Sequence, residues 1–190
     1  IPESSLRPAF GPGRSLRAHA LFSSQLPPKS QQSLWLPNPS SISKGELKYI
    51  KAGEMEGVCD GYKCSIRKPW FVVPGVDVPD AVFSVFNDRP LLIVNDAKMV
   101  ASNSHLCATM LEKVKVEQLV GGWYTSLTQL FVELEIHSLG GGVLIAVPQE
   151  LSRVRIPSSA PATKKHMNAI SGFLAKDDFS GACSLGDKFL

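Results

Sequence analysis

The sequence predicts an α+β fold, with a mixed, mostly antiparallel sheet and two or three helices. Three features carry this prediction: a helix-start signal at Ser43, short apolar runs separated by turn residues between 62 and 111, and apolar residues at helical spacing over 123–134. Short strands joined by turns favour antiparallel pairing, because a parallel pair needs a long crossover connection. The order of helix, strands, helix and strand therefore indicates α+β rather than a repeating βα pattern.

Composition divides the chain of 190 residues into three segments. Residues 1–42 contain seven prolines and many Ser and Gln, which predicts an extended arm or linker that forms strands in part. Residues 43–157 hold nearly all of the periodic apolar signal and are predicted to form the domain. Residues 158–190 begin Ser-Ser-Ala-Pro and are expected to be a mobile C-terminal tail with at best a weak helix over 164–174.

The first helix is predicted from its N-terminal end. Ser43, followed three residues later by Glu46, is typical of a capping box, in which each side chain accepts a hydrogen bond from a backbone N–H. A glycine, Gly53 or Gly57, ends the helix. A partial apolar stripe lies between these signals, at Leu47, Ile50 and Met55.

Strands are predicted next. Residues 62–67 read Tyr-Lys-Cys-Ser-Ile-Arg, and this alternation places Lys63, Ser65 and Arg67 on one face of a strand. Turn residues 87–90 predict a hairpin between two neighbouring strands. Further apolar runs predict strands over 70–73, 81–86, 91–95 and 105–111.

The last part of the domain combines a helix with a short strand. Apolar residues at helical spacing predict the helix, and Gly140, Gly141 and Gly142 are expected to stop it. A strand over 143–147 and a helical turn opening at Pro148 follow. The residues that carry the helix are Leu127, Leu130, Phe131 and Leu134, with Trp123 nearby.

Composition and charge exclude several classes of protein. The apolar fraction of 44% is too high for a wholly disordered chain, and a net charge of +3 is too small for a purely electrostatic nucleic-acid tail. No run approaches 18 apolar residues, so no membrane partner is expected. The start of the chain predicts no signal peptide, and Ile in place of Met at position 1 suits a fragment or a trimmed product.

Neither the cysteines nor any known enzyme motif in the sequence indicates a catalytic or metal site. The four cysteines form no Cys-x-x-Cys pair and lack a nearby His, so we expect no metal ligands, and free thiols in a reducing cytoplasm. No P-loop and no Gly-x-Ser-x-Gly motif occurs. Asp77 and Asp80 stand three residues apart in a turn-rich stretch. A pair of catalytic carboxylates is one interpretation, but solvation of both side chains in a loop is more common. No catalytic residue is assigned.

One group of side chains stands above this background. Lys63, Arg67 and Lys68 precede Trp70 within eight residues. Cations can neutralise phosphates while an aromatic ring packs on a sugar or a displaced base, which predicts a nucleic-acid interface. The alternative is a solvated strand face, with Trp70 in the core.

These residues also carry a resemblance to a known family. In order along the chain, the pieces resemble the C-terminal target-recognition domain of N6-adenine DNA methyltransferases from restriction-modification systems. The pieces are Tyr-Ile-Lys-Ala-Gly-Glu at 49–54, Gly-Val at 57–58, Tyr-Lys-Cys at 62–64, Arg67, Pro-Trp-Phe at 69–71, Val-Pro at 73–74, Val-Pro-Asp at 78–80, Leu-Ile-Val-Asn at 92–95, Ala-Ser-Asn-Ser at 101–104, Ser126 before Leu130 and Glu133, the glycine-rich stretch 139–144, Pro148, and Ile-Pro at 156–157.

The resemblance implies a module that reads sequence in double-stranded DNA beside a catalytic methyltransferase domain or subunit. It implies DNA contacts for Lys63, Arg67, Lys68 and Trp70, and a close backbone approach at the glycine-rich segment, at Gly140, Gly141 and Gly142. It also suggests base contacts from a polar stretch, at Ser102, Asn103 and Ser104. The family's catalytic Asn-Pro-Pro-aromatic motif is missing, since Asn38-Pro39-Ser40 lacks both the second Pro and the aromatic. The S-adenosylmethionine loop is missing too, so no cofactor is expected in this chain and methyl transfer is assigned to the parent enzyme.

Two other functions remain open. The chain could be a structural or protein-interaction subunit that docks on a separate methyltransferase or nuclease, with Leu127, Leu130 and Phe131 as candidates for an exposed apolar face. A stand-alone methyltransferase of another type is disfavoured by the missing motifs.

Overall fold

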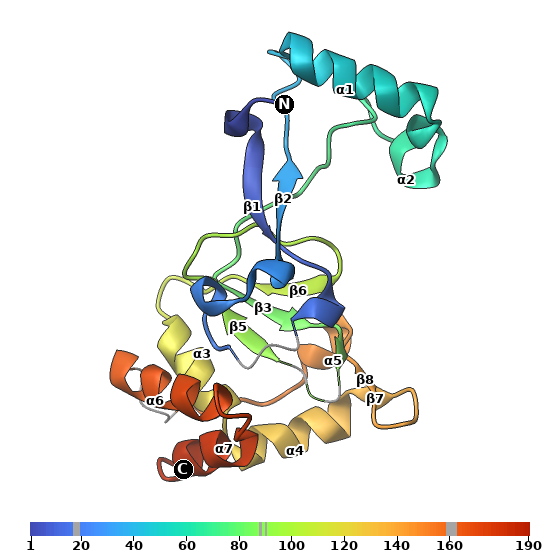
Figure 1. The fold of residues 1–190 in the computed structure, drawn as a ribbon. Helices are drawn as coiled ribbons and strands as arrows, with labels where there is room; N and C mark the ends of the chain where they lie inside the picture. The colour runs from blue at the N-terminus through green and yellow to red at the C-terminus, as the bar shows by residue number, and fades with distance from the viewer. Residues whose placement is uncertain (17–19, 88, 90, 159–162) are drawn as a thin grey trace.

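The computed structural model describes residues 1–16, 20–87, 89, 91–158 and 163–190. It is α+β, as predicted, but its described residues hold seven α-helices where two or three were expected, and three small antiparallel sheets where one was expected. Figure 1 shows an elongated molecule in which a body carries most elements and a smaller lobe lies at the far end of a two-stranded ribbon. We call residues 36–73 the outer lobe.

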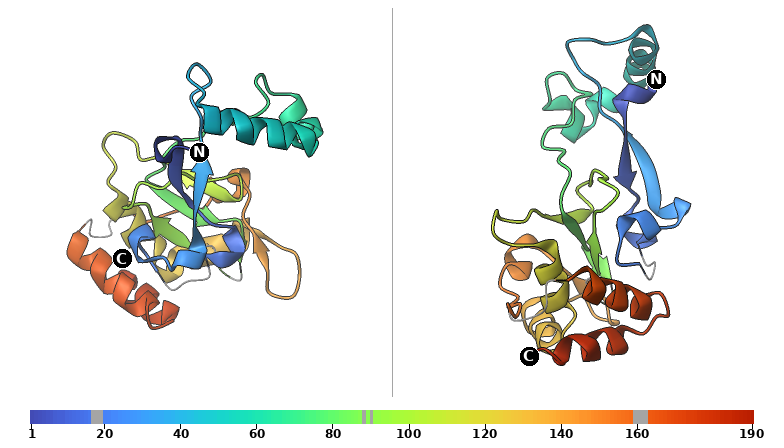
Figure 2. Two further views of the ribbon diagram at one scale, coloured as in Figure 1. Left: turned by 45° about the horizontal axis from the view of Figure 1, so that its top comes forward. Right: turned by 90° about the vertical axis from the view of Figure 1, so that its left-hand side faces the viewer.

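The ribbon consists of β1 (Leu6–Phe10) and β2 (Gln31–Trp35), which pair antiparallel from Leu6↔Trp35 to Phe10↔Gln31. Its base enters the body, where the backbone N–H of Phe10 donates to the carbonyl of Val100 at 3.0 Å and the Phe10 side chain is buried. Its other end reaches the outer lobe, and the side view of Figure 2 shows the ribbon and the 73–80 segment as the two connections between lobe and body. The segment expected to be an arm thus positions the outer lobe.

The outer lobe begins with α1 (Lys44–Met55), continues through a 3-10 turn, η5 (Val58–Asp60), and ends after α2 (Tyr62–Ser65). The predicted capping box is confirmed: the backbone N–H of Glu46 donates to Ser43 Oγ at 3.2 Å, and the N–H of Ser43 donates to Glu46 Oε2 at 2.9 Å. Gly57, in the left-handed region with φ 73°, follows the end of α1.

The central sheet of the body confirms three predicted strands. β3 (Ala81–Ser84) lies between β5 (Leu92–Val94) and β6 (His105–Ala108), and both pairings are antiparallel. A second sheet has the order β4 (Phe86–Asn87), β8 (Leu144–Ile145), β7 (His137–Ser138). Two residues of the predicted 87–90 turn, Asp88 and Pro90, lie outside the described residues. The strand predicted over 70–73 is wrong, because this stretch is a turn and irregular chain that packs its aromatic residues instead of pairing.

Helices cover the sheets and enclose the larger core, in which Trp123, Tyr124 and Ile170 are fully buried. The helix predicted over 123–134 is present as two, because α3 (Val116–Trp123) ends at Trp123 and Thr125 caps α4 (Ser126–Glu135). The remaining helices of the body are α5 (Pro148–Leu151), α6 (Lys164–Leu174) and α7 (Phe179–Asp187), and short 3-10 turns occur at η1 (Glu3–Ser5), η2 (Gly13–Ser15), η3 (Ser23–Gln25) and η4 (Pro28–Ser30).

The helix predicted over 164–174 is present as α6 (Lys164–Leu174), but the C-terminal segment packs against the body through α6 and α7 instead of forming the expected tail. Met167, Ile170 and Leu174 stand at i, i+3 and i+7 and are buried in the core. The carboxylate of Asp187 ties α7 to α4, accepting from the Ser126 backbone N–H at 2.7 Å. Burial of the apolar face of α6 thus holds the C-terminal segment against the body, although the first residues of the segment have the composition of a linker.

In the part of the chain that the structure describes, no helix combines the length and the hydrophobicity needed to cross a membrane. All four cysteines are free thiols. The described residues contain no group of three or more His, Cys, Asp or Glu side chains that could hold a metal ion.

Candidate nucleic-acid interface

Four aromatic rings hold the outer lobe together. Trp35, at the end of β2, meets Tyr49 of α1 edge-on, with ring centroids 5.1 Å apart. It stacks on Phe71 at 6.0 Å, and Phe71 meets Trp70 edge-on at 5.9 Å. Aromatic pairs at these separations are favourable beyond the apolar area that they bury. The cluster fixes α1 against the ribbon and against the chain that follows α2.

A buried carboxylate completes this attachment. Glu46 is only 2% exposed, and its Oε1 accepts the indole N–H of Trp35 at 3.2 Å. Hydrogen bonds from the Ser5 hydroxyl and from the Ser43 backbone N–H lower the pKa of Glu46 to about 2. The side chain is therefore a carboxylate at neutral pH, and one residue links α1, β2 and the N-terminal turn.

Lys63, Arg67 and Lys68 lie in the outer lobe, but the strand predicted for residues 62–67 is wrong. Residues 62–65 form α2, one helical turn that follows Gly61. Among the described residues no strand pairs with this stretch, and six alternating residues are too few to exclude a helical turn. Lys63 and Arg67 are separated by about one helical turn, and Lys63 and Lys68 are exposed.

Trp70 has packing contacts in the structure. Its ring lies over Gly53, where a Cβ atom would be 2.8 Å from Trp70 Cη2. Its indole N–H donates to Glu54 Oε1 at 3.3 Å, and the side chain is half-buried. These contacts give Trp70 a role in positioning α1, while its contact with DNA stays a prediction.

The predicted polar contacts lie elsewhere. Ser102, Asn103 and Ser104 precede β6 at the base of the ribbon. The hydroxyls of Ser102 and Ser104 bond each other at 2.7 Å, and Ser104 Oγ lies 3.3 Å from His105 Nδ1. Asn103 is exposed and is therefore the member of the three best placed for an external partner.

Gly140, Gly141 and Gly142 form the connection between β7 and β8 rather than the stop of a helix. Their φ angles of 89°, 62° and 80° all lie in the left-handed region, and a Cβ at any of them would meet open space. The backbone there is exposed, as a close approach by a partner requires. Figure 1 shows this connection, the 102–104 loop and the outer lobe as three separate places.

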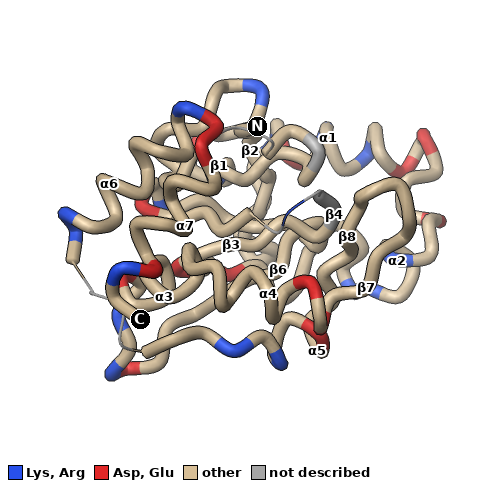
Figure 3. The backbone as a smooth tube through the Cα atoms, turned by 90° about the horizontal axis from the view of Figure 1, so that it is seen from below, with Lys and Arg blue, Asp and Glu red and all other residues tan. Residues whose placement is uncertain are grey.

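Of the outer lobe, the 102–104 loop and the connection between β7 and β8, the outer lobe carries the largest excess of positive charge. It holds six cations and four carboxylates, and Glu46 is buried. No ion pair joins any of these cations to a carboxylate anywhere in the described residues. Figure 3 shows Lys and Arg segments on both α1 and α2. The lysines of α1, namely Lys44, Lys48 and Lys51, were not among the predicted site residues, although their spacing of four and three places them on one helix face.

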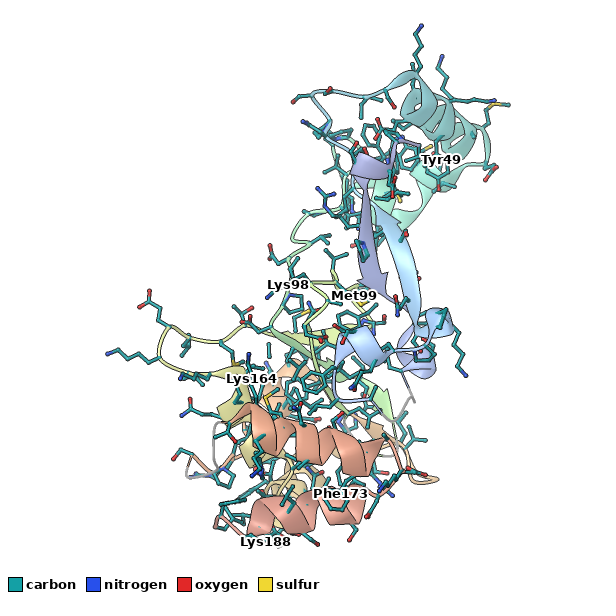
Figure 4. All side chains as sticks on the ribbon, turned by 60° about the vertical axis from the view of Figure 1, so that its left-hand side comes forward. Tyr49, Lys98, Met99, Lys164, Phe173 and Lys188 are labelled. Carbon is teal, nitrogen blue, oxygen red and sulfur yellow. The ribbon has the colours of Figure 1, made fainter. Side chains whose placement is uncertain are left out.

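A cleft of about 290 Å³ also lies in the body, outside every predicted site. Lys98 and Lys164, on the same side of the body in Figure 4, line it together with Asp80, Asp96 and Glu117. Three carboxylates against two lysines do not favour an anionic ligand. None of the described residues that line it is a glycine, so they do not form a glycine-rich cofactor loop, and we assign no cofactor to the cleft.

Comparison with known protein families identifies the family of this chain. Residues 7–190 match the family described as "Type II methyltransferase M.Eco57I, C-terminal domain". The match runs through the ribbon, the outer lobe, the body and both C-terminal helices. A search of curated proteins gave no match.

Proposed function

The chain belongs to the family of the C-terminal domain of the type II methyltransferase M.Eco57I, and from this premise we propose that it is the DNA-recognition module of an adenine-N6-specific DNA methyltransferase of a restriction-modification system. In this proposal the module binds double-stranded DNA while a separate catalytic domain or subunit binds S-adenosylmethionine and transfers the methyl group. The catalytic part would flip the target adenine out of the duplex, since its chemistry cannot reach a stacked base.

The observation that carries the proposal is the unpaired basic surface of the outer lobe. Surface cations that lack carboxylate partners are available to replace the counterions of DNA phosphates. Lys63 and Lys68 are exposed, and Arg67 has the planar donor group that suits a phosphate or a guanine edge. The ribbon holds this surface away from the body (Figure 2).

The other predicted contacts have secondary roles in this proposal. Asn103 would offer an amide to a base edge, and Ser102 and Ser104 would hold its loop in place through their mutual hydrogen bond. The exposed backbone of Gly140, Gly141 and Gly142 would approach a phosphate or the catalytic domain.

Binding of the chain to a labelled DNA duplex at two salt concentrations tests the proposal. We expect affinity to fall as salt rises, and the double variant Lys63→Ala/Arg67→Ala to bind more weakly with a shallower salt dependence. The matched control is Arg153→Ala/Arg155→Ala, which removes two exposed cations from the body. Unchanged binding by the Lys63/Arg67 variant would remove these residues from the interface, and no binding by the wild type would reject DNA recognition by this chain.

A second function is favoured by one observation, the apolar face of α4. Leu127, Leu130 and Leu134 are 43%, 53% and 69% exposed at i, i+3 and i+7, whereas Phe131 packs in part against the core. An exposed apolar stripe of this kind suits docking on another protein surface, which here would be the catalytic part. Capture of the chain by the separately expressed catalytic part, retained at high salt, tests this docking role. Loss of capture as salt rises would contradict an apolar contact.

A further inference from the structure

α1 presents a face of lysines that the outer lobe does not use. Lys44, Lys48 and Lys51 stand at i, i+4 and i+7, and all three are exposed. The opposite face of the helix carries Glu46 and Ile50, which are buried. We call the first group the α1 lysine stripe.

The orientation of this stripe is fixed. Glu46 holds the start of α1 to Trp35 and to the capping box, and Gly53 packs against the ring of Trp70 near its end. A helix held at both ends cannot rotate about its axis, so the lysines point away from the lobe. Figure 4 shows α1 at the outer end of the molecule, beside the label of Tyr49.

Repulsion among the three lysines disfavours the helix that carries them. Lys48 has Lys44 and Lys51 as its neighbours one turn away, and like charges at these spacings destabilise a helix. Lys44 also occupies the first turn, where the helix dipole disfavours a cation. Their arrangement is unfavourable within the lobe and becomes favourable against a row of negative charges.

The spacing suits one strand of a duplex. The stripe spans seven residues, or about 10.5 Å along the helix axis. Each of the three lysines spread over this length can reach one phosphate of a strand that runs past the helix. We infer that the α1 lysine stripe is a second DNA-backbone contact, distinct from the group around Lys63, and that it binds about three consecutive phosphates without reading sequence.

This inference rests on the proposed DNA-recognition function, and the salt dependence of binding tests it separately. The variant Lys44→Gln/Lys48→Gln/Lys51→Gln removes three charges and keeps good helix formers. Its matched control, Lys165→Gln/Lys176→Gln/Lys188→Gln, removes three exposed lysines of the body: one in α6, one in the turn before α7 and one directly after α7. The probe is a labelled double-stranded oligonucleotide of mixed sequence, titrated with the full chain over a range of NaCl concentrations.

The expected result is weaker binding by the stripe variant and a slope of log affinity against log salt that is smaller by about 3, since each lost phosphate contact removes about 0.9. The control should change the slope by less than about 1. The single variant Lys48→Gln, in the middle of the exposed face, should lower the slope by about 1, and it keeps the test valid if the triple variant does not fold.

Three outcomes overturn the inference. If the wild type binds DNA and the stripe variant keeps the wild-type slope, the inference fails and the proposed function stands. If the control variant lowers the salt slope as much as the stripe variant does, net charge rather than the stripe sets the slope, and the inference fails. Absence of DNA binding by the wild type would reject the proposed function together with this inference.

Discussion

The carboxylate of Glu46 accepts a hydrogen bond from the indole N–H of Trp35 at 3.2 Å, which joins the first turn of α1 to the last residue of β2. The same carboxylate closes the capping box with Ser43. Since Lys44, Lys48 and Lys51 project from the other side of this helix, the bond orients the outermost basic surface of the molecule.

The first prediction concerns pH. The pKa of Glu46 is lowered from 4.5 to about 2 in the folded chain, mainly by the Ser5 hydroxyl and by Ser43. A carboxyl group whose pKa is lower in the folded than in the unfolded chain stabilises the fold. This stabilisation is fully present above the unfolded pKa and is lost as pH falls from about 4.5 to about 2. We expect unfolding midpoints of the wild type to fall over this window and those of Glu46→Gln to fall less. Parallel pH profiles for the two proteins would show that Glu46 has no special role.

The second prediction concerns the C-terminal helices. A Cβ on Gly186 would collide with the carbonyl oxygen of Tyr124, so Gly186→Ala should destabilise the chain by about 1–3 kcal/mol. The matched control is Gly172→Ala in α6, which meets open space and should stabilise the chain by about 0.5–1 kcal/mol. Urea unfolding measures both values. Equal midpoints for Gly186→Ala and the wild type would mean that α7 does not pack on the body.

The third prediction concerns the glycine connection between β7 and β8. Gly141 has a φ of 62° and open space around it, so Gly141→Ala should cost about 1 kcal/mol through backbone strain alone. Gly141→Asn should cost less, because Asn tolerates this conformation. Thermal unfolding of the two variants checks the order, and an Asn variant less stable than the Ala variant would contradict it.

The fourth prediction concerns the apolar face of α4. Leu130 is 53% exposed, so Leu130→Glu should change the free energy of unfolding by no more than about 0.5 kcal/mol. If this face docks on the catalytic part, the variant should be captured less well than the wild type. Full capture of a folded Leu130→Glu variant would remove α4 from the docking surface.

Sequence reasoning predicted the elements whose signals are local. The capping box of Ser43 and Glu46 and the strands around 81–84, 92–94 and 105–108 each depend on a few adjacent residues. It failed where six alternating residues at 62–67 also suited a helical turn. It also missed what only tertiary contact shows, such as Trp35 meeting Tyr49 and Phe71 from distant parts of the chain. The lysines of α1 were visible as a spacing in the sequence, but only the buried face of the helix shows that they point outward.

Photocrosslinking tests most directly whether the outer lobe contacts DNA. A photoreactive residue in place of Tyr62, which is 80% exposed beside Lys63, is compared with one in place of Leu190, which is 56% exposed at the C-terminus. With a labelled duplex at low salt, we expect a crosslink to DNA from position 62 and none from position 190. A crosslink from position 190 with none from position 62, under conditions where the chain binds the duplex, would contradict the account.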